Sequence, residues 1–210
     1  MIGRIIKENE MEGVKMSILY DYFGGLYINL TNQCPCRCEF CVRNYTDSLG
    51  SADSLLLDKE PTVDEVICEL QKWDVAKYEE VIFCGYGEPT ERLEELLQIA
   101  EHIRKTYGKP IRLNTNGLAD LIWGRETAAE LEGLIDTVSI SMNEADAEKY
   151  NALCHPKFGI KSYDAMIQYI SEVKKYVPNV AVSVVGCISE ESIALCRKKS
   201  EALGVKFRVR

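Results

Sequence analysis

A group of cysteines near the start of the chain offers the side chains best suited to chemistry. Cys34, Cys38 and Cys41 have the spacing C-x3-C-x2-C, and Cys36 lies inside the run. Thiolates are soft ligands that suit iron–sulfur clusters and zinc. Three thiolates on one short loop would hold three irons of a cubane cluster and leave the fourth iron open, whereas a four-cysteine cluster is closed. An open iron could bind and act on a small molecule.

A structural zinc site is the alternative interpretation of these cysteines, with Cys36 as the fourth ligand. Zinc ribbons draw two ligand pairs from separated segments, and the sequence has no second C-x2-C pair. The spacing therefore favours a cluster held by Cys34, Cys38 and Cys41, and we assign Cys36 no ligand role.

The composition of the chain narrows its class and its partners. Its 210 residues are 46% hydrophobic and 28% charged, as expected for one globular domain. A net charge of −8 without a long basic run argues against nucleic acid as a partner. The sequence has neither a membrane-length apolar stretch nor a secretory signal. We therefore expect a cytoplasmic protein, in which clustered cysteines bind metal or act in catalysis.

Short apolar runs alternate with amphipathic stretches from residue 26 onward. The expected strands cover residues 26–30, 81–84, 110–113, 137–142, 180–185 and 206–210. The expected helices start near residues 62 and 90 and cover residues 126–134, 145–153, 163–176 and 190–203. Such alternation implies a parallel α/β sheet with right-handed crossovers, and six units do not close an eight-stranded barrel. We expect an open, partial (β/α)6 TIM-like barrel over residues 26–210, preceded by an N-terminal extension of residues 1–25 that could be a strand, a helix or a plug.

Polar and glycine-rich segments recur at the predicted strand ends, where reactive residues of parallel barrels gather. They are the cysteine loop, Gly87-Glu88-Pro89, Asn114 with Asn116, Ser141 with Asn143, and Gly186-Cys187. In the fourth strand, alternation directs Ser139, Ser141 and Asn143 to the face opposite Val138 and Ile140. Unpaired buried hydroxyl and amide groups cost about 1–3 kcal/mol each. Either a bound ligand or a polar cluster inside the barrel would pair them.

These motifs together resemble the radical S-adenosylmethionine (SAM) superfamily. The cysteine run has the aromatic Phe40 just before its last cysteine, as in that family. Gly85-Tyr86-Gly87-Glu88-Pro89 begins about 46 residues after the cysteine run and is similar to the family's glycine-glycine-glutamate-proline segment, with Tyr86 in place of a second glycine. The resemblance covers residues 26–210. Residues 38–44, 85–90 and 154–159 look most like the TatD-associated radical SAM group.

The resemblance implies two cofactors, a 4Fe-4S cluster on the three cysteines and SAM. The SAM contacts it implies are Phe40, the backbone edge at Gly87, Glu88 and Pro89, the polar groups of Asn114, Ser141 and Asn143, and Val185 against adenine. One electron from flavodoxin or ferredoxin would cleave SAM to methionine and a 5′-deoxyadenosyl radical, which abstracts hydrogen from an unidentified substrate.

Three alternatives remain open at the level of the sequence. The protein could generate a glycyl radical on a partner protein, because an open barrel could admit a partner's loop. It could modify a small molecule or a peptide. It could instead be a zinc-stabilised binding module without enzymatic activity.

Overall fold

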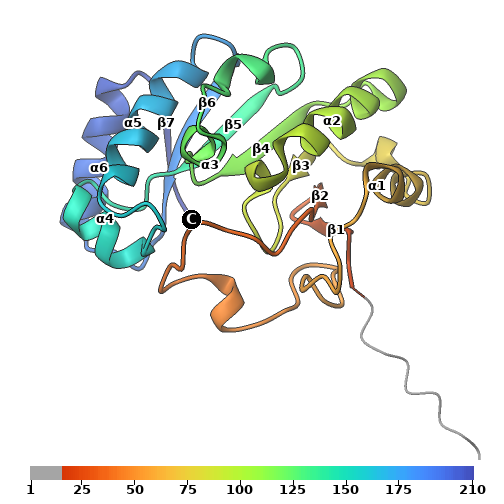
Figure 1. Ribbon diagram of the computed structural model, residues 1–210, viewed down its shortest axis with the longest axis horizontal. Helices are drawn as coiled ribbons and strands as arrows, with labels where there is room; N and C mark the ends of the chain where they lie inside the picture. The colour runs from red at the N-terminus through yellow and green to blue at the C-terminus, as the bar shows by residue number, and fades with distance from the viewer. Residues whose placement is uncertain (1–15) are drawn as a thin grey trace, which may run out of the picture.

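Among residues 16–210, which the computed structural model describes, seven strands form one curved sheet in the order β1 to β7 (Figure 1). The strands are β1 (Leu19–Tyr22), β2 (Gly25–Ile28), β3 (Val81–Phe83), β4 (Ile111–Thr115), β5 (Thr137–Ser141), β6 (Asn179–Val184) and β7 (Lys206–Val209). Strands β2 to β7 pair in parallel, and β1 pairs antiparallel with β2. The predicted open α/β fold with six parallel strands is confirmed.

The antiparallel strand β1 comes from the predicted N-terminal extension. It forms a hairpin with β2, and the turn places Phe23 and Gly24 at positive φ. Of the three conformations left open for residues 1–25, a strand is therefore observed for residues 19–22. Residues 1–15 of the extension lie outside the described part.

Helices follow the strands along the outer side of the sheet (Figure 1). They are α1 (Val63–Leu70), α2 (Leu93–Tyr107), α3 (Ala119–Trp123), α4 (Ala147–Cys154), α5 (Lys161–Val173) and α6 (Glu190–Ala202). Four short 3-10 helices are η1 (Val42–Asn44), η2 (Val75–Lys77), η3 (Pro89–Arg92) and η4 (Ala128–Leu131). Helix α1 begins as predicted, because Thr62 and Glu65 form a reciprocal capping box.

The predicted helix over residues 126–134 is wrong. This stretch contains only the 3-10 helix η4, and the α-helix of this crossover is α3, which lies earlier in the chain. Gly124 ends α3 in the left-handed conformation, and Gly133 has a φ of 71°. Glu132, with φ −59° and ψ 132°, has already left the helical conformation, and the left-handed Gly133 cannot lie inside a regular α-helix.

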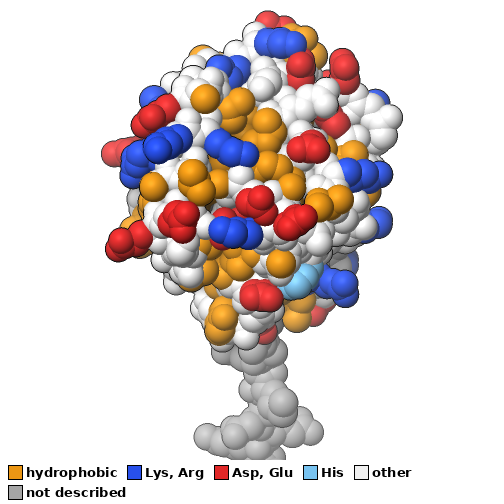
Figure 2. All heavy atoms as spheres, turned by 90° about the vertical axis from the view of Figure 1, so that its left-hand side faces the viewer, with side chains coloured by type: hydrophobic (Ala, Val, Ile, Leu, Met, Phe, Trp, Pro, Cys, Tyr) orange, Lys and Arg blue, Asp and Glu red, His pale blue; other side chains and the backbone are white. Residues whose placement is uncertain are grey.

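The sheet buries its apolar side chains against the helices. The main core fully buries Val138 and Ile140 of β5 and Met142, the residue directly after this strand. The predicted alternation is therefore confirmed. Figure 2 shows that acidic and basic side chains are intermingled with hydrophobic ones over the outer helical face. No helix in residues 16–210 is both long enough and apolar enough to cross a membrane.

Candidate cofactor site

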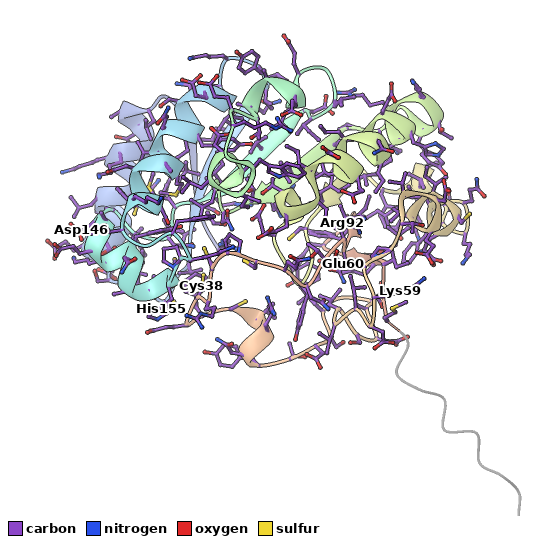
Figure 3. All side chains as sticks on the ribbon, in the orientation of Figure 1. Cys38, Lys59, Glu60, Arg92, Asp146 and His155 are labelled. Carbon is purple, nitrogen blue, oxygen red and sulfur yellow. The ribbon has the colours of Figure 1, made fainter. Side chains whose placement is uncertain are left out.

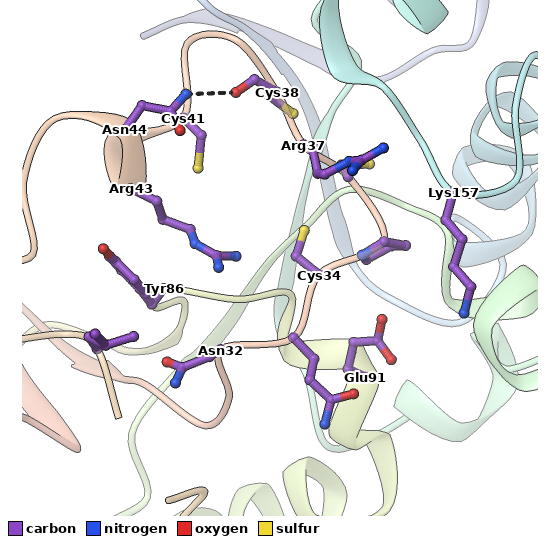
Figure 4. A pocket seen from close by; sticks show the side chains of 14 residues that line it. Asn32, Cys34, Arg37, Cys38, Cys41, Arg43, Asn44, Tyr86, Glu91 and Lys157 are labelled. Carbon is purple, nitrogen blue, oxygen red and sulfur yellow. Dashed lines mark hydrogen bonds between the residues drawn. The ribbon is translucent and has the colours of Figure 1, made fainter. Parts of the chain in front are cut away.

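The predicted metal ligands lie on the loop that follows β2, and they line one cavity. Cys34, Cys38 and Cys41 contribute to the wall of a cavity of about 790 Å³ (Figure 4). Cys36 also reaches this wall, although its side chain is buried. Phe40 is half-buried against the core and is not part of the wall.

Backbone hydrogen bonds tie the cysteine loop to the end of α4. The amide of Arg37 donates to the carbonyl oxygen of Cys154 over 3.0 Å, and the amide of Glu39 donates to that of Leu153 over 3.1 Å. In return, the amide of Lys157 donates to the carbonyl oxygen of Pro35 over 2.7 Å. Figure 3 shows Cys38 close to His155, the residue directly after α4. The position of the thiols therefore depends on a helix more than 100 residues later in the chain.

Neighbouring thiols prepare Cys38 as a thiolate. Hydrogen bonds from the Cys154 and Cys36 thiols lower the pKa of Cys38 to about 4. The same contacts with Cys38, together with burial, raise the pKa of Cys154. Hydrogen bonding to Cys34 and Cys38 raises the pKa of Cys36. Since the thiolate is the form that binds metal, the contacts hold Cys38 ready as a ligand, whereas burial raises the pKa of the Cys41 thiol.

The glycine-rich segment after β3 packs directly on the backbone of the cysteine loop. A Cβ atom built on Gly87 would overlap the carbonyl oxygens of Gln33 and Thr31. The amide of Glu88 donates a hydrogen bond to the same Gln33 carbonyl oxygen over 2.8 Å. Glycine is needed at position 87 because only a residue without a side chain permits this approach.

The carboxylate of Glu88 is buried and already fully engaged. One oxygen accepts hydrogen bonds from the amide and hydroxyl of Thr90 and from the hydroxyl of Thr115, and the other accepts from the amide of Asn116 over 2.7 Å. Burial raises the pKa of this carboxyl, and the four hydrogen bonds oppose that shift. The side chain of Glu88 thus fastens the end of β3 to the end of β4.

Ser141 and Asn143 lie together at the end of β5. The Nη2 atom of Arg210 donates to Ser141 Oγ over 2.9 Å and to Asn143 Oδ1 over 3.3 Å. Asn143 has a φ of 59°, a conformation that asparagine tolerates better than most residues. Its amide nitrogen lies 3.7 Å from the sulfur of Cys154, which connects this strand end to the cysteine loop. The polar cluster that the sequence allowed inside the barrel is therefore present.

The remaining predicted cofactor contacts lie at neighbouring strand ends and do not line the large cavity. Asn114 is in β4, and its buried side-chain oxygen has no hydrogen-bond partner among residues 16–210. Val185 follows β6 and is half-buried. Pro89 is buried at the start of η3. Because β2 to β6 run parallel, these residues lie at the same end of the sheet as the cysteine loop after β2.

Sequence reasoning missed several side chains of the cavity wall. Arg43 lies 5.0 Å above the ring of Tyr86, and both line the cavity together with Lys157 (Figure 4). The hydroxyl of Tyr86 donates to Asp47, and burial raises the pKa of Tyr86 to about 12. The substitution of tyrosine for the usual glycine in the Gly-rich segment was the available signal for this wall.

These residues fit the two cofactors that the motifs imply. Within the described residues, no three His, Cys, Asp or Glu side chains converge closely enough to hold one metal ion. In a cubane cluster each cysteine binds a different iron, so three thiols spread along one cavity wall suit that group. The buried side-chain oxygen of Asn114, which has no hydrogen-bond partner among residues 16–210, is a further acceptor at the end of β4.

Comparison with curated proteins finds partial relatives. The chain is 29% identical over 172 residues to the probable GTP 3′,8-cyclase of Thermococcus kodakarensis, covering 80% of this chain and 50% of that protein. It is 28% identical over 165 residues to the tungsten-containing aldehyde ferredoxin oxidoreductase cofactor-modifying protein of Pyrococcus furiosus, covering 76% and 43%. The chain thus spans half or less of the length of these relatives.

Solved structures share the fold at low sequence identity. The radical SAM methyltransferase from Sphaerobacter thermophilus has a TM-score of 0.60 at 16% identity, over 91% of this chain and 57% of that chain. Streptococcus suis SuiB bound to its precursor peptide SuiA has a TM-score of 0.63 at 14% identity, over 89% and 38%. The family model of the radical SAM superfamily matches residues 28–194 of this chain. The strand ends, the cysteine loop and this match lead to one conclusion: the chain belongs to the radical SAM superfamily and is an enzyme.

Proposed function

We propose that this protein holds a 4Fe-4S cluster through Cys34, Cys38 and Cys41 and uses it to cleave SAM. When bound, the cluster and SAM supply the 5′-deoxyadenosyl radical that abstracts a hydrogen atom from the substrate. The observation that supports this function best is the common cavity of the three thiols, on a loop held by α4 and by the Gly87 segment.

The chain's own residues would bind and orient SAM. Main-chain carbonyl groups of Gly87, Glu88 and Pro89 are good acceptors for an ammonium group, and the packing of Gly87 on the cysteine loop holds this backbone edge beside the thiols. We assign the ribose and the carboxylate to Ser141 and Asn143.

Three further residues complete the proposed SAM site. The unpartnered oxygen of Asn114 would accept a hydrogen bond from SAM or from the substrate. Val185 would pack against adenine, and Phe40 would support the loop beside Cys41. Flavodoxin or ferredoxin would deliver the electron, as the family resemblance implies.

The substrate is a separate question, because the names of the relatives point to different targets. One name specifies GTP, another a cofactor of an oxidoreductase, and the SuiB structure contains a peptide. Family membership decides against the non-enzymatic zinc-stabilised module. Assignment to the TatD-associated group remains a prediction, as does the choice between a small molecule and a partner protein that receives a glycyl radical.

The ligand assignment can be tested by comparing Cys38→Ala with Cys36→Ala. Both remove one thiol from the same loop, so they are matched for local perturbation. After anaerobic reconstitution, Cys36→Ala should keep the iron and sulfide content, the brown absorbance and the SAM-dependent change in the electron paramagnetic resonance signal. Cys38→Ala should lose all of these together with 5′-deoxyadenosine formation. A Cys38→Ala protein with an intact, SAM-responsive cluster would overturn the assignment.

A further inference from the structure

Strand β7 directs two arginines to the inner side of the sheet. Side chains alternate along a strand, and Phe207 packs on the helical side, where the guanidinium of Arg197 stacks 4.7 Å from its ring. Arg208 and Arg210 therefore occupy the opposite side, which Ser139 and Ser141 also face. Both arginines are exposed to solvent, so a dissolved ligand can reach them.

The two arginines reach across β6 to β5. Ser183 of β6 pairs with Arg208 on one side and with Ser141 on the other. Because Ala181 and Ser183 are small, the long side chains can extend over β6. Arg208 Nη2 lies 3.3 Å from the hydroxyl oxygen of Ser139, and the Nη2 atom of Arg210 forms the bonds to Ser141 and Asn143 described above.

Neither Arg208 nor Arg210 has a carboxylate partner in the part of the chain that the structure describes. In residues 16–210, no Asp or Glu side chain lies within 4.0 Å of either guanidinium. The other arginine inside the barrel, Arg112, is paired with Glu80 over 2.7 Å. A guanidinium offers five N–H donors, and the recorded partners of Arg208 and Arg210 are neutral oxygens, so most donors stay available.

The position of this pair places it beside the proposed radical chemistry. The charge of Arg210 favours the thiolate forms of Cys38, Cys84 and Cys154, although burial raises the pKa of Cys84 and hydrogen bonding to Cys38 raises the pKa of Cys154. The charge of Arg208 likewise opposes the effect of burial on the pKa of Tyr27, which lies across the barrel on β2. Arg210 also donates a hydrogen bond to Asn143, whose amide nitrogen lies 3.7 Å from the sulfur of Cys154. These contacts link Arg210 to the helix end that holds the cysteine loop.

We propose that Arg208 and Arg210 form an oxyanion subsite that anchors the substrate through a carboxylate or a phosphate group. The planar, forked guanidinium matches both groups and binds them by paired hydrogen bonds. Two such forks on alternate residues of one strand, without a carboxylate to neutralise them, are suited to an anion of two or more charges. This inference rests on the proposed function, because it takes the barrel interior to be the place where the substrate meets the radical.

Isothermal titration of the full chain, reconstituted anaerobically, tests this subsite with pyrophosphate and with malonate as probes. The wild type should bind at least one probe with saturation at low ionic strength. Arg208→Gln and Arg210→Gln should each weaken that binding at least tenfold, and Arg208→Lys should weaken it less than Arg208→Gln. Arg197→Gln, which removes an arginine from the outer side, should bind like the wild type. Preference for pyrophosphate would indicate a phosphate-bearing substrate, and preference for malonate a carboxylate.

Three results would overturn the subsite. The first is that the wild type shows no saturable probe binding. The second is that Arg197→Gln and Arg208→Gln weaken probe binding equally. The third is that SAM displaces the probe completely, which would assign the arginines to the SAM carboxylate. The probes need no cluster, so Cys38→Ala should bind them normally. A wild-type protein that has a SAM-responsive cluster but no saturable probe binding contradicts this subsite alone. A wild-type protein that binds the probe but forms no SAM-responsive cluster contradicts the proposed function alone.

Discussion

The amide nitrogen of Glu88 lies 2.8 Å from the carbonyl oxygen of Gln33 and donates a hydrogen bond to it. This contact joins the glycine-rich segment after β3 to the cysteine loop after β2. Gly87 lies at the same junction, against the carbonyl oxygens of Thr31 and Gln33. The backbone edge proposed for SAM and the loop proposed for the cluster are therefore one structural unit.

Gly87→Ala should separate the two segments of this unit. The added methyl group meets backbone rather than a flexible side chain, and such overpacking costs about 1–3 kcal/mol. We expect a lower free energy of unfolding in urea and loss of SAM binding. Gly186→Ala is the matched control, because its Cβ would find its nearest neighbour at an ordinary contact distance of 3.5 Å. Equal stability of both variants and wild type would contradict the close approach.

Glu88→Gln should destabilise the protein although it conserves size. All four recorded partners of the carboxylate donate hydrogen bonds, and the new amide group would point a donor at a donor. A buried unsatisfied group costs about 1–3 kcal/mol, which chemical denaturation of the cluster-free protein would detect. Glu94→Gln, at an exposed position of α2, should leave stability unchanged. A stable Glu88→Gln protein that fails only in SAM binding would instead indicate direct contact with the cofactor.

Asn143→Gly should weaken SAM binding while preserving the backbone. Glycine adopts a φ near 59° without strain, so this variant removes the side-chain amide together with its contacts to Arg210 and Cys154. Losing one hydrogen bond to a charged group costs about 1.5 kcal/mol, which corresponds to a roughly tenfold higher Kd. Equilibrium binding of SAM to the reconstituted protein measures this change. Asn179→Ala, at the exposed start of β6, should bind SAM like the wild type, and an unchanged Kd for Asn143→Gly would remove Asn143 from the SAM site.

Removing the cluster should leave the cysteine loop folded. Its amides at Arg37 and Glu39 donate to α4 carbonyl groups, and Pro35 accepts from Lys157, so the loop has anchors that do not involve metal. Hydrogen exchange followed by mass spectrometry should show slow exchange at these amides in the chelator-treated protein, close to that of the reconstituted protein. Exchange at the rate of an unstructured peptide would mean that the metal organises the loop.

The sequence alone was sufficient for features that depend on local pattern. The alternation of β5 correctly divided Val138 and Ile140 from Ser139 and Ser141, because strand geometry has a period of two residues. The cysteine spacing identified the family, and the cluster on Cys34, Cys38 and Cys41 stays a prediction. The alternation of strands and helices along the chain predicted the open parallel sheet, because a helix that connects two successive strands allows them to run parallel. The predicted helix over residues 126–134 was wrong because Gly133 adopts the left-handed conformation inside that range, which a regular α-helix does not allow.

Only the tertiary structure decided which distant groups meet. No local pattern places Cys154 beside Cys38, or the Glu88 carboxylate among donors from the end of β4. Arg210 is separated from Ser141 by 69 positions, and their contact exists because β6 between them carries small side chains and the parallel register aligns the strand ends. Pairing across a sheet is set by packing of the whole core, which is why these contacts, and the charge they leave inside the barrel, could not be derived from the order of residues.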